Sequence, residues 1–465
     1  MKRNQMTRRR LLQSGAALSV GAGMWQGGVA PSFATSKPIA LGLKPQKKAL
    51  VFIMLDGGND SFNMLVPTSE HHYRAYQNSR SNLALDRQTL LPLKGATDKE
   101  GRSFGLHPAM PDVARLFNQK QLSFVANCGP MIEPVRAADM HSGRAKLPLG
   151  LLSHADQFKH WQSARPDQRV NQGWFGSFAD ALQPNRPAHQ IPMNISLAGS
   201  NIMQNGVSSS HYSIQEQGSV GLVVNEEDTP LNQVLLASFE QLLQTDYGSD
   251  PFKQSYLSQT REAQAQHEVF RRGIQPFRLP VDFPDTPLAQ QLAMVARSIA
   301  AADGLNHQQQ TFFLRYIGWD HHDELLQNHA AMLGVLSEAL GTFQQALQKM
   351  GLADQVVTFT GSDFGRTLTS NGNGTDHGWG GNTMVMGADL AGGRVVGSYP
   401  DLTLGDRNDL DAGDGVIIPT TAIEQIYAEI AHWFGVEKPY LSKLFPNVHR
   451  FTGGRAERSL GLFKS

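Results

Sequence analysis

The sequence contains a single cysteine, Cys128, in 465 residues. An intrachain disulfide therefore cannot form, even in an oxidising compartment. Runs of Lys and Arg interleaved with aromatic residues are also missing, so nucleic acid is not an expected partner. The chain is 40% hydrophobic and 18% charged, which is typical of a globular protein that buries a core without disulfide bonds.

The formal charge of zero hides an uneven distribution. Five of the 41 Lys and Arg residues lie within residues 1–34, which contain no Asp or Glu, so the remainder carries a net charge of about −5. The segment TRRRLLQ (7–13) precedes an apolar stretch rich in Gly and Ala, and Ser-Phe-Ala ends at Ala34. This pattern predicts a twin-arginine signal peptide over 1–34, cleaved after Ala34 and followed by a linker over 35–48.

The predicted leader places the mature protein in the periplasm or outside the cell, with no membrane anchor after cleavage. An uncleaved transmembrane anchor is the alternative. The apolar stretch is short for a bilayer and is interrupted by Gln26 and several glycines, which favours the cleaved peptide. Twin-arginine substrates are folded before export, often with a metal already bound, which is compatible with a metal site in this chain.

Short apolar runs alternate with amphipathic stretches along the rest of the chain, which predicts an α/β fold with a largely parallel central sheet and helices on both faces. We expect one domain over 49–465 with an irregular insertion around 194–230. Strands are predicted at 49–55, 122–126, 312–317, 356–360 and 383–386, and helices at 107–120, 153–161, 328–350 and 420–434. Three more helices are expected between 228 and 301, with start signals at Thr229, Ser255 and Thr286.

Polar, glycine-flanked clusters follow three of the predicted strands. In open α/β sheets the carboxyl ends of the strands carry the functional groups, so these clusters are expected to meet at one edge. Carboxylates and imidazoles that meet in this way can bind a divalent metal for hydrolysis. The clusters are DGGNDSFN (56–63), GWDHHD (318–323) and GSDFGRT (361–367), the last followed by TDHGWGG (375–381).

These motifs resemble a known family. The leader and the segments LDGGNDSFNMLVP (55–67), GLHPAMPDV (105–113), LLSHADQFKHW (151–161), GWDHHDE (318–324), GSDFGRT and TDHGWGG are similar, in this order, to the bacterial domain-of-unknown-function 1501 family. That family is grouped with the alkaline-phosphatase-like fold, which also includes sulfatases and cofactor-independent phosphoglycerate mutases. The resemblance implies this fold without supplying a characterised reaction.

The resemblance also implies a set of metal ligands. Asp56 is similar to the first metal-binding Asp of the superfamily, and Asp320 and His322 resemble its paired Asp and His. The segment VVTFTGSDFG (356–365) is similar to the superfamily's strand followed by Ser-Asp-His-Gly, which makes Asp363 a ligand, and His377 corresponds to the last His. The implied cofactor is a divalent metal such as zinc, manganese or calcium.

Two positions depart from the expected pattern. The family's usual acid at 363 is Glu, but Asp363 keeps the carboxylate. Phe364 stands where the motif has His or Asn, so one ligand is missing, and ligand loss turns a two-metal site into a one-metal or an empty site. A sulfatase would also need Cys-x-Pro-x-Arg, but Ile132 occupies the Arg position after Cys128. We therefore exclude a formylglycine sulfatase.

Three residues are candidates for catalysis. The superfamily nucleophile lies at a helix N-terminus, where backbone N–H groups favour an anion, and Ser153 is the candidate here, with His154 beside it. Ser153 is equally well explained as a helix N-cap. Arg366 is a candidate for binding an anionic group, or else a structural clamp that pairs with Asp363 or Asp376.

Two functions follow from these residues. The first is an exported, metal-dependent hydrolase of phosphate or sulfate esters that acts on an anionic small molecule or glycan. The second is a non-catalytic binding protein of the same fold with a vestigial metal site. The missing ligand at Phe364 favours the second, whereas the strand-end carboxylates and histidines favour the first. The sequence identifies no protein partner.

Overall fold

The first apolar run of the chain forms β1 (Lys48–Asp56), which lies inside a nine-stranded sheet. The computed structural model describes residues 38–43, 46–98, 100–221, 229–245, 248 and 250–464. The predicted signal peptide and the start of the predicted linker lie outside these residues. Residues Pro38–Ser465 group into one compact unit.

The central sheet is largely parallel, as predicted. Its strand order is β11-β5-β10-β9-β1-β8-β6-β7, with β12 beside β5, and within the described residues only β10 runs antiparallel to its neighbours. The other strands are β5 (Leu122–Gly129), β6 (Asn194–Ser196), β7 (Tyr212–Ser213), β8 (Gln309–Ile317), β9 (Val356–Ser362), β10 (Gly381–Gly387), β11 (Val395–Gly397) and β12 (Thr421–Ala422). A smaller antiparallel sheet has the order β2-β4-β3 and consists of β2 (Leu65–Pro67), β4 (Ser103–Leu106) and β3 (Leu91–Thr97).

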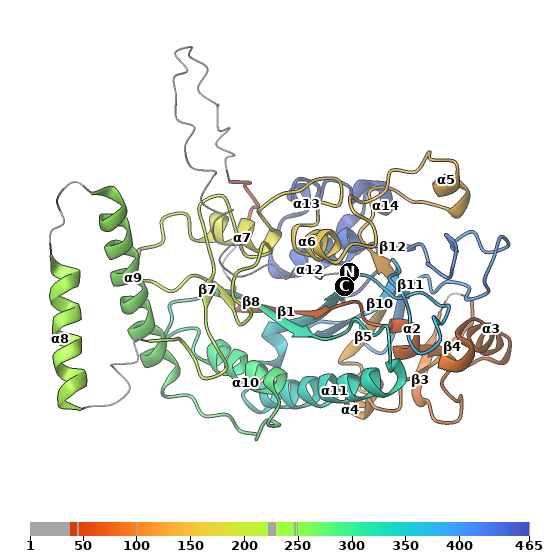
Figure 1. The fold of residues 1–465 in the computed structure, drawn as a ribbon, viewed down its shortest axis with the longest axis horizontal. Coiled ribbons are helices and arrows are strands. Elements are labelled where there is room, and N and C mark those ends of the chain that lie inside the picture. The colour runs from red at the N-terminus through yellow and green to blue at the C-terminus, as the bar shows by residue number, and fades with distance from the viewer. Residues whose placement is uncertain are drawn as a thin grey trace, which may run out of the picture. The chain divides into compact units, whose positions relative to one another are not determined.

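Helices cover both faces of the central sheet, which confirms the predicted layering. Along β1 the buried side chains alternate: Val51 and Ile53 join one hydrophobic cluster, and Phe52 and Met54 join the other. Figure 1 shows α10 (Pro287–Ala300) and α11 (Leu325–Lys349) on one side, and α6 (His154–Ser163), α7 (Trp174–Leu182) and α12 (Ile423–Phe434) on the other. The remaining α-helices are α2 (Ser61–Met64), α3 (Glu70–Arg80), α4 (Pro111–Asn118), α5 (Ala137–His141), α8 (Pro230–Gln244), α9 (Pro251–Ile274), α13 (Lys438–Leu444) and α14 (His449–Thr452).

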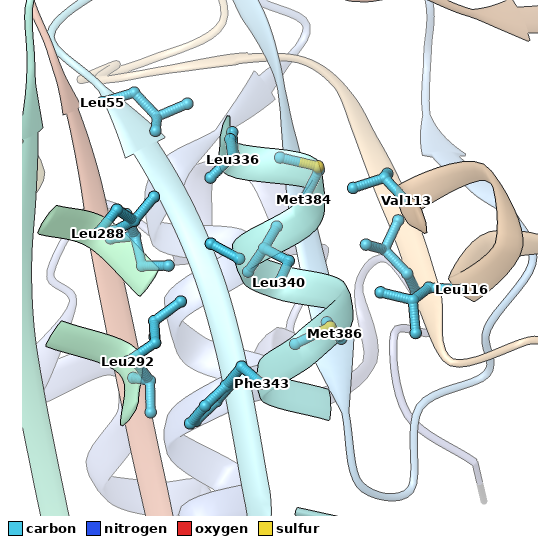
Figure 2. Packing of buried hydrophobic residues seen from close by; sticks show 14 of the residues in the cluster. Leu55, Val113, Leu116, Leu288, Leu292, Leu336, Leu340, Phe343, Met384 and Met386 are labelled. Carbon is cyan, nitrogen blue, oxygen red and sulfur yellow. The ribbon is translucent and has the colours of Figure 1, made fainter. Parts of the chain in front are cut away.

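The first hydrophobic cluster includes side chains of three helices that pack against strands of the sheet. Burying such side chains is the main favourable term in folding. Figure 2 shows α4, α10 and α11 contributing to this cluster next to β1 and β10, through Val113, Leu116, Leu288, Leu292, Leu336, Leu340, Phe343, Leu55, Met384 and Met386.

Helix boundaries follow local capping chemistry. The predicted start at Ser255 is wrong, because the carboxylate of Asp250 accepts hydrogen bonds from the N–H groups of Phe252 and Lys253 and begins α9 at Pro251. Thr229 caps α8 as predicted, through a hydrogen bond from the N–H of Asn232.

The segment predicted as an irregular insertion, 194–230, contains regular structure as well. Its short strands β6 and β7 extend the central sheet beyond β8. The sequence patterns of these strands are too short to distinguish from the surrounding loops. Residues 222–228 of the segment lie outside the described part of the chain.

A buried ion pair anchors the loop that follows β1. Arg80, at the end of α3, pairs with Asp60, and the side chains of both residues have no exposed area. The same guanidinium donates to the Thr367 carbonyl oxygen (2.8 Å) and to Asn63 Oδ1 (3.1 Å). Arg80 therefore joins the segments that follow β1 and β9 at the same edge of the sheet.

We predict that Arg80→Ala lowers the free energy of unfolding by about 3–5 kcal/mol, because it leaves the Asp60 carboxylate buried without its cation. Arg74→Ala on the same helix is the matched control: its pair with Glu70 is exposed on both sides, and its loss should cost less than about 1 kcal/mol. Urea unfolding of the two variants measures the difference. Equal losses would contradict the structural role of Arg80.

Candidate functional site

The carboxyl ends of three neighbouring strands form the edge that carries the site. In the parallel register, Asp56 of β1 lies beside Ile317 of β8, and Leu55 lies beside Ser362 of β9. The antiparallel strand β10 begins at this same edge, so the segment between β9 and β10, residues 363–380, begins and ends there. The sheet topology thus brings three polar loops together.

His154, Asp320 and His377 form a compact group at this edge, and we call it the His–Asp cluster. One ligand atom from each lies within 4.8 Å of the other two. The two Nε2 atoms of His154 and His377 are 3.1 Å apart. Asp320 places Oδ2 3.5 Å from His154 Nε2 and Oδ1 3.4 Å from His377 Nε2.

His322 adjoins the His–Asp cluster on its solvent side. Its Nε2 lies 3.0 Å from Asp320 Oδ1 and 3.1 Å from His377 Nε2. The side chains of His322 and Asp320 are each 43% exposed, so small molecules can reach the cluster from solvent. Of the five metal ligands predicted from sequence, the structure brings Asp320, His322 and His377 into mutual contact.

Each of the three imidazoles has an acceptor at Nδ1. His154 Nδ1 donates to Asp363 Oδ2 (2.7 Å) and His377 Nδ1 to the carbonyl oxygen of Leu152 (2.9 Å). His322 Nδ1 lies 3.2 Å from Asp376 Oδ1. A carbonyl or an ionised carboxylate only accepts, so for His154 and His377 these partners assign the hydrogen to Nδ1 and leave a lone pair on Nε2 of the neutral ring. His322 has a carboxylate near both ring nitrogens, so its contacts do not assign the hydrogen.

The assignment of the hydrogens has an electrostatic consequence. Two neutral rings with lone pairs on Nε2 cannot form a hydrogen bond with each other, although His154 and His377 place these atoms 3.1 Å apart. The Asp320 carboxylate adds negative charge at the same point. A proton or a metal cation among these atoms removes the repulsion, and the His–Asp cluster can therefore hold a cation.

The protonation of the cluster is uneven. The hydrogen bond to Asp363 raises the pKa of His154 above its ordinary value, whereas burial lowers the pKa of His377. Burial also raises the pKa of Asp363. For Asp320 burial acts in the same direction, but Arg366, His322 and His154 together outweigh it, and the pKa of Asp320 lies below its ordinary value.

Phe364, which the sequence shows as a lost ligand, packs against the cluster. The side chain is buried, with ring centroids 4.7 Å from His154 and 4.6 Å from His377. It therefore acts as an apolar wall that limits the rotation of both imidazoles.

Arg366, predicted either to bind an anion or to act as a clamp, is 1% exposed. Its guanidinium donates to the Asp320 carboxylate, to the Thr375 carbonyl and hydroxyl oxygens, and to the Gly57 carbonyl oxygen. These contacts fix Asp320 relative to two neighbouring loops. The carboxylate that Arg366 pairs with is thus Asp320, and not Asp363 or Asp376 as the clamp interpretation expected.

Asp56 does not join the His–Asp cluster in the structure. Its carboxylate pairs with Arg315 of β8, through Nε at 2.9 Å and a second guanidinium nitrogen. Arg315 also lies over the ring of Phe158, 4.9 Å from its centroid. Sequence reasoning missed Arg315, although a charged residue near the end of an apolar strand was a usable signal.

Ser153 is the N-cap residue of α6, directly before His154. Its side chain makes no capping hydrogen bond, so the hydroxyl is not committed to the helix end. The nucleophile assignment for Ser153 stays a prediction.

Fold and site together define an α/β protein with a histidine–carboxylate cluster at the carboxyl edge of a largely parallel sheet. The chain belongs to the family described as "Protein of unknown function (DUF1501)", whose pattern matches residues 47–438. No curated protein matches the chain.

Several solved structures are similar to the chain. Ps i-CgsB shares 10% identity over 88% of this chain and 78% of its own, with a TM-score of 0.35. The C-terminal periplasmic domain of EcEptC from Escherichia coli shares 8% over 86% and 87%, with a TM-score of 0.35. A protein in the alkaline phosphatase superfamily from Vibrio parahaemolyticus shares 11% over 83% and 70%, with a TM-score of 0.32. Since these TM-scores are below 0.5, the likenesses transfer neither an activity nor site residues to this chain.

We predict that the pKa values of the two adjacent imidazoles are shifted in opposite directions in the metal-free protein. His154 should titrate above its ordinary pKa of 6.5 and His377 below it. Protonated His154 therefore stabilises the fold at low pH, and this contribution is lost as the pH rises through its raised pKa. Long-range ¹H–¹⁵N NMR of labelled histidines measures both values, and a higher pKa for His377 than for His154 would contradict the assignment.

Proposed function

We propose that this chain is an exported, metal-dependent hydrolase of phosphate or sulfate esters, with one divalent ion held by His154, Asp320 and His377. The observation that carries the proposal is the convergence of these three ligand atoms within 4.8 Å at the carboxyl edge of the sheet. His322, beside Asp320 and His377, is placed to complete the ligand set.

The residues fit a metal ion in their donor chemistry. Imidazole and carboxylate ligands are typical of zinc and manganese, whereas calcium takes oxygen ligands, so the donor set favours the first two. Histidines that bind metal usually donate their other ring N–H to a carboxylate or a carbonyl oxygen, and all three imidazoles here have such a partner.

An ion at this place would supply an acidified water molecule and a Lewis acid for an ester oxygen. The chain's own residues supply access and orientation. Asp320 and His322 are partly exposed, and Arg366 holds the Asp320 carboxylate from the buried side. Arg315, with 34% of its side chain exposed at the same sheet edge, is the cation that an anionic substrate would meet.

Export is part of the proposal because of the predicted twin-arginine leader over 1–34. Among the described helices, none combines the length and the apolar character needed to cross a membrane. A chain that folds before export can acquire its metal in the cytoplasm. The leader and the cluster are therefore compatible with each other.

A non-catalytic binding protein is the second candidate. The observation that favours it is the pairing of Asp56 with Arg315, together with Phe364 in place of a ligand. Both features reduce the number of groups that could hold a second ion. This candidate keeps the fold, has a vestigial metal site and hydrolyses no ester.

The test uses protein purified from the periplasm of cells that express the full chain. We expect about one equivalent of zinc or manganese by elemental analysis, and hydrolysis of p-nitrophenyl phosphate or p-nitrophenyl sulfate. Asp320→Ala should lose the metal and at least about 100-fold of the activity, because it removes a ligand. Asp323→Ala is the matched control, since Asp323 is exposed and bonds only to Glu324 and Asn373 in the described structure.

Each outcome separates the candidates. Metal without hydrolysis of either ester would support the binding protein and contradict the hydrolase. Wild-type protein that carries no metal and cleaves neither ester would likewise contradict the hydrolase and support a binding protein with a vestigial site. An equal loss of metal in the Asp320 and Asp323 variants would show that the His–Asp cluster is not the binding site.

A further inference from the structure

We infer that Asp363 is a positioning residue, which orients His154 and strengthens its bond to the metal, and not a metal ligand as the sequence predicts. The inference rests on the proposed metal site but not on the proposed hydrolysis. It assigns a separate role to a carboxylate that lies behind the His–Asp cluster.

The imidazole of His154 stands between Asp363 and the cluster. Its Nδ1 faces Asp363 Oδ2 at 2.7 Å, and its Nε2 faces His377 and Asp320. Asp363 Oδ2 also accepts a hydrogen bond from the N–H of Gly57 at 3.2 Å. One carboxylate oxygen is therefore held by two donors on the side of the ring away from the cluster.

The second oxygen, Asp363 Oδ1, is buried and has no hydrogen-bond partner in the described part of the chain. It could serve an ion shared with Asp56, which is the arrangement predicted from sequence. Arg315 already pairs with Asp56 and supplies the positive charge there. A guanidinium beside Asp56 disfavours a second cation at this place by charge repulsion.

Among the three Nδ1 contacts, the contact of Asp363 should influence the metal most. The Asp363 side chain has no exposed area, whereas that of Asp376, the partner of His322, is 62% exposed. The third acceptor, the carbonyl oxygen of Leu152, carries no formal charge. A charge acts more strongly on its partner in a buried site than in water, so the basicity of Nε2 should depend most on Asp363.

Asp363→Asn isolates the charge from the geometry. The N–H of Gly57 needs an acceptor at the Oδ2 position, so the amide oxygen of the variant should point there. That oxygen still accepts from His154 Nδ1, and the tautomer of His154 is kept. The variant thus loses the negative charge but keeps the orientation of the ring.

The experiment compares wild-type protein with Asp363→Asn, Asp376→Asn and Asp323→Asn, each freed of metal and then titrated with Zn²⁺ and Co²⁺ against a chromophoric chelator. We expect Asp363→Asn to weaken metal binding about 10- to 100-fold, as the loss of a carboxylate partner of a ligating histidine does elsewhere. Asp376→Asn should weaken it less than about 5-fold because solvent screens its charge. Asp323→Asn should have no effect.

The visible spectrum of the Co²⁺-loaded proteins distinguishes positioning from ligation. A positioning role predicts one equivalent of Co²⁺ and an unchanged band shape in Asp363→Asn, at reduced affinity. A fall from two equivalents to one, or a change in the coordination bands, would identify Asp363 as a ligand and overturn the inference. An affinity equal to that of Asp323→Asn would also overturn it.

Two controls keep the inference testable. Circular dichroism checks that each variant folds, and if Asp363→Asn does not, ¹H–¹⁵N NMR of metal-loaded wild-type protein gives the tautomer of His154 directly. The inference predicts a proton on Nδ1 of His154, and a proton on Nε2 would contradict it. Wild-type protein that binds metal but cleaves no ester would end the hydrolase proposal and leave the role of Asp363 intact, whereas protein without metal would overturn both.

Discussion

The site depends on one constraint: the imidazoles of His154 and His377 face each other with the same ring atom, Nε2. His154 and His377 place their Nε2 atoms 3.1 Å apart beside the carboxylate of Asp320, while each Nδ1 is engaged by an acceptor. Neutral rings cannot satisfy this arrangement with each other. Packing by Phe364 and the hydrogen bond from Arg366 hold the groups in place, and a proton or a metal cation among the Nε2 atoms would remove the repulsion between them.

The sheet makes this arrangement possible because one of its strands, β10, runs antiparallel to its neighbours. Because β10 runs antiparallel, the segment 363–380 returns along the edge where β9 ends and brings Asp363 and His377 to the same place. The N-terminus of α6 meets this segment from a region about 200 residues earlier in the sequence, and the first residue of that helix is His154. The cluster is therefore a product of tertiary structure, and its integrity should follow the stability of the sheet edge.

Sequence patterns predicted five strands of the central sheet (β1, β5, β8, β9 and β10), its parallel character and the edge where the polar clusters meet, because apolar runs and strand-end glycines are local signals. They missed the short strands β6, β7, β11 and β12 and the smaller sheet of β2, β3 and β4. They did not reveal that Arg315 pairs with Asp56, or that His154 faces the cluster while Asp363 lies behind it. Asp56 and Arg315 are 259 positions apart in the sequence, and His154 and Asp363 are 209 positions apart. Their contacts depend on which way each side chain points in the folded protein. The start of α9 was misplaced for a local reason, since Asp250 caps it more effectively than Ser255.

Anomalous X-ray diffraction from crystals of the metal-loaded protein tests the proposed metal site most directly. One peak is predicted among His154 Nε2, Asp320 and His377 Nε2, at roughly 2.0–2.3 Å from each ligand atom, with His154 Nδ1 still bonded to Asp363. A peak between Asp56 and Asp363, or crystals of the metal-loaded protein without any peak at the cluster, would contradict it.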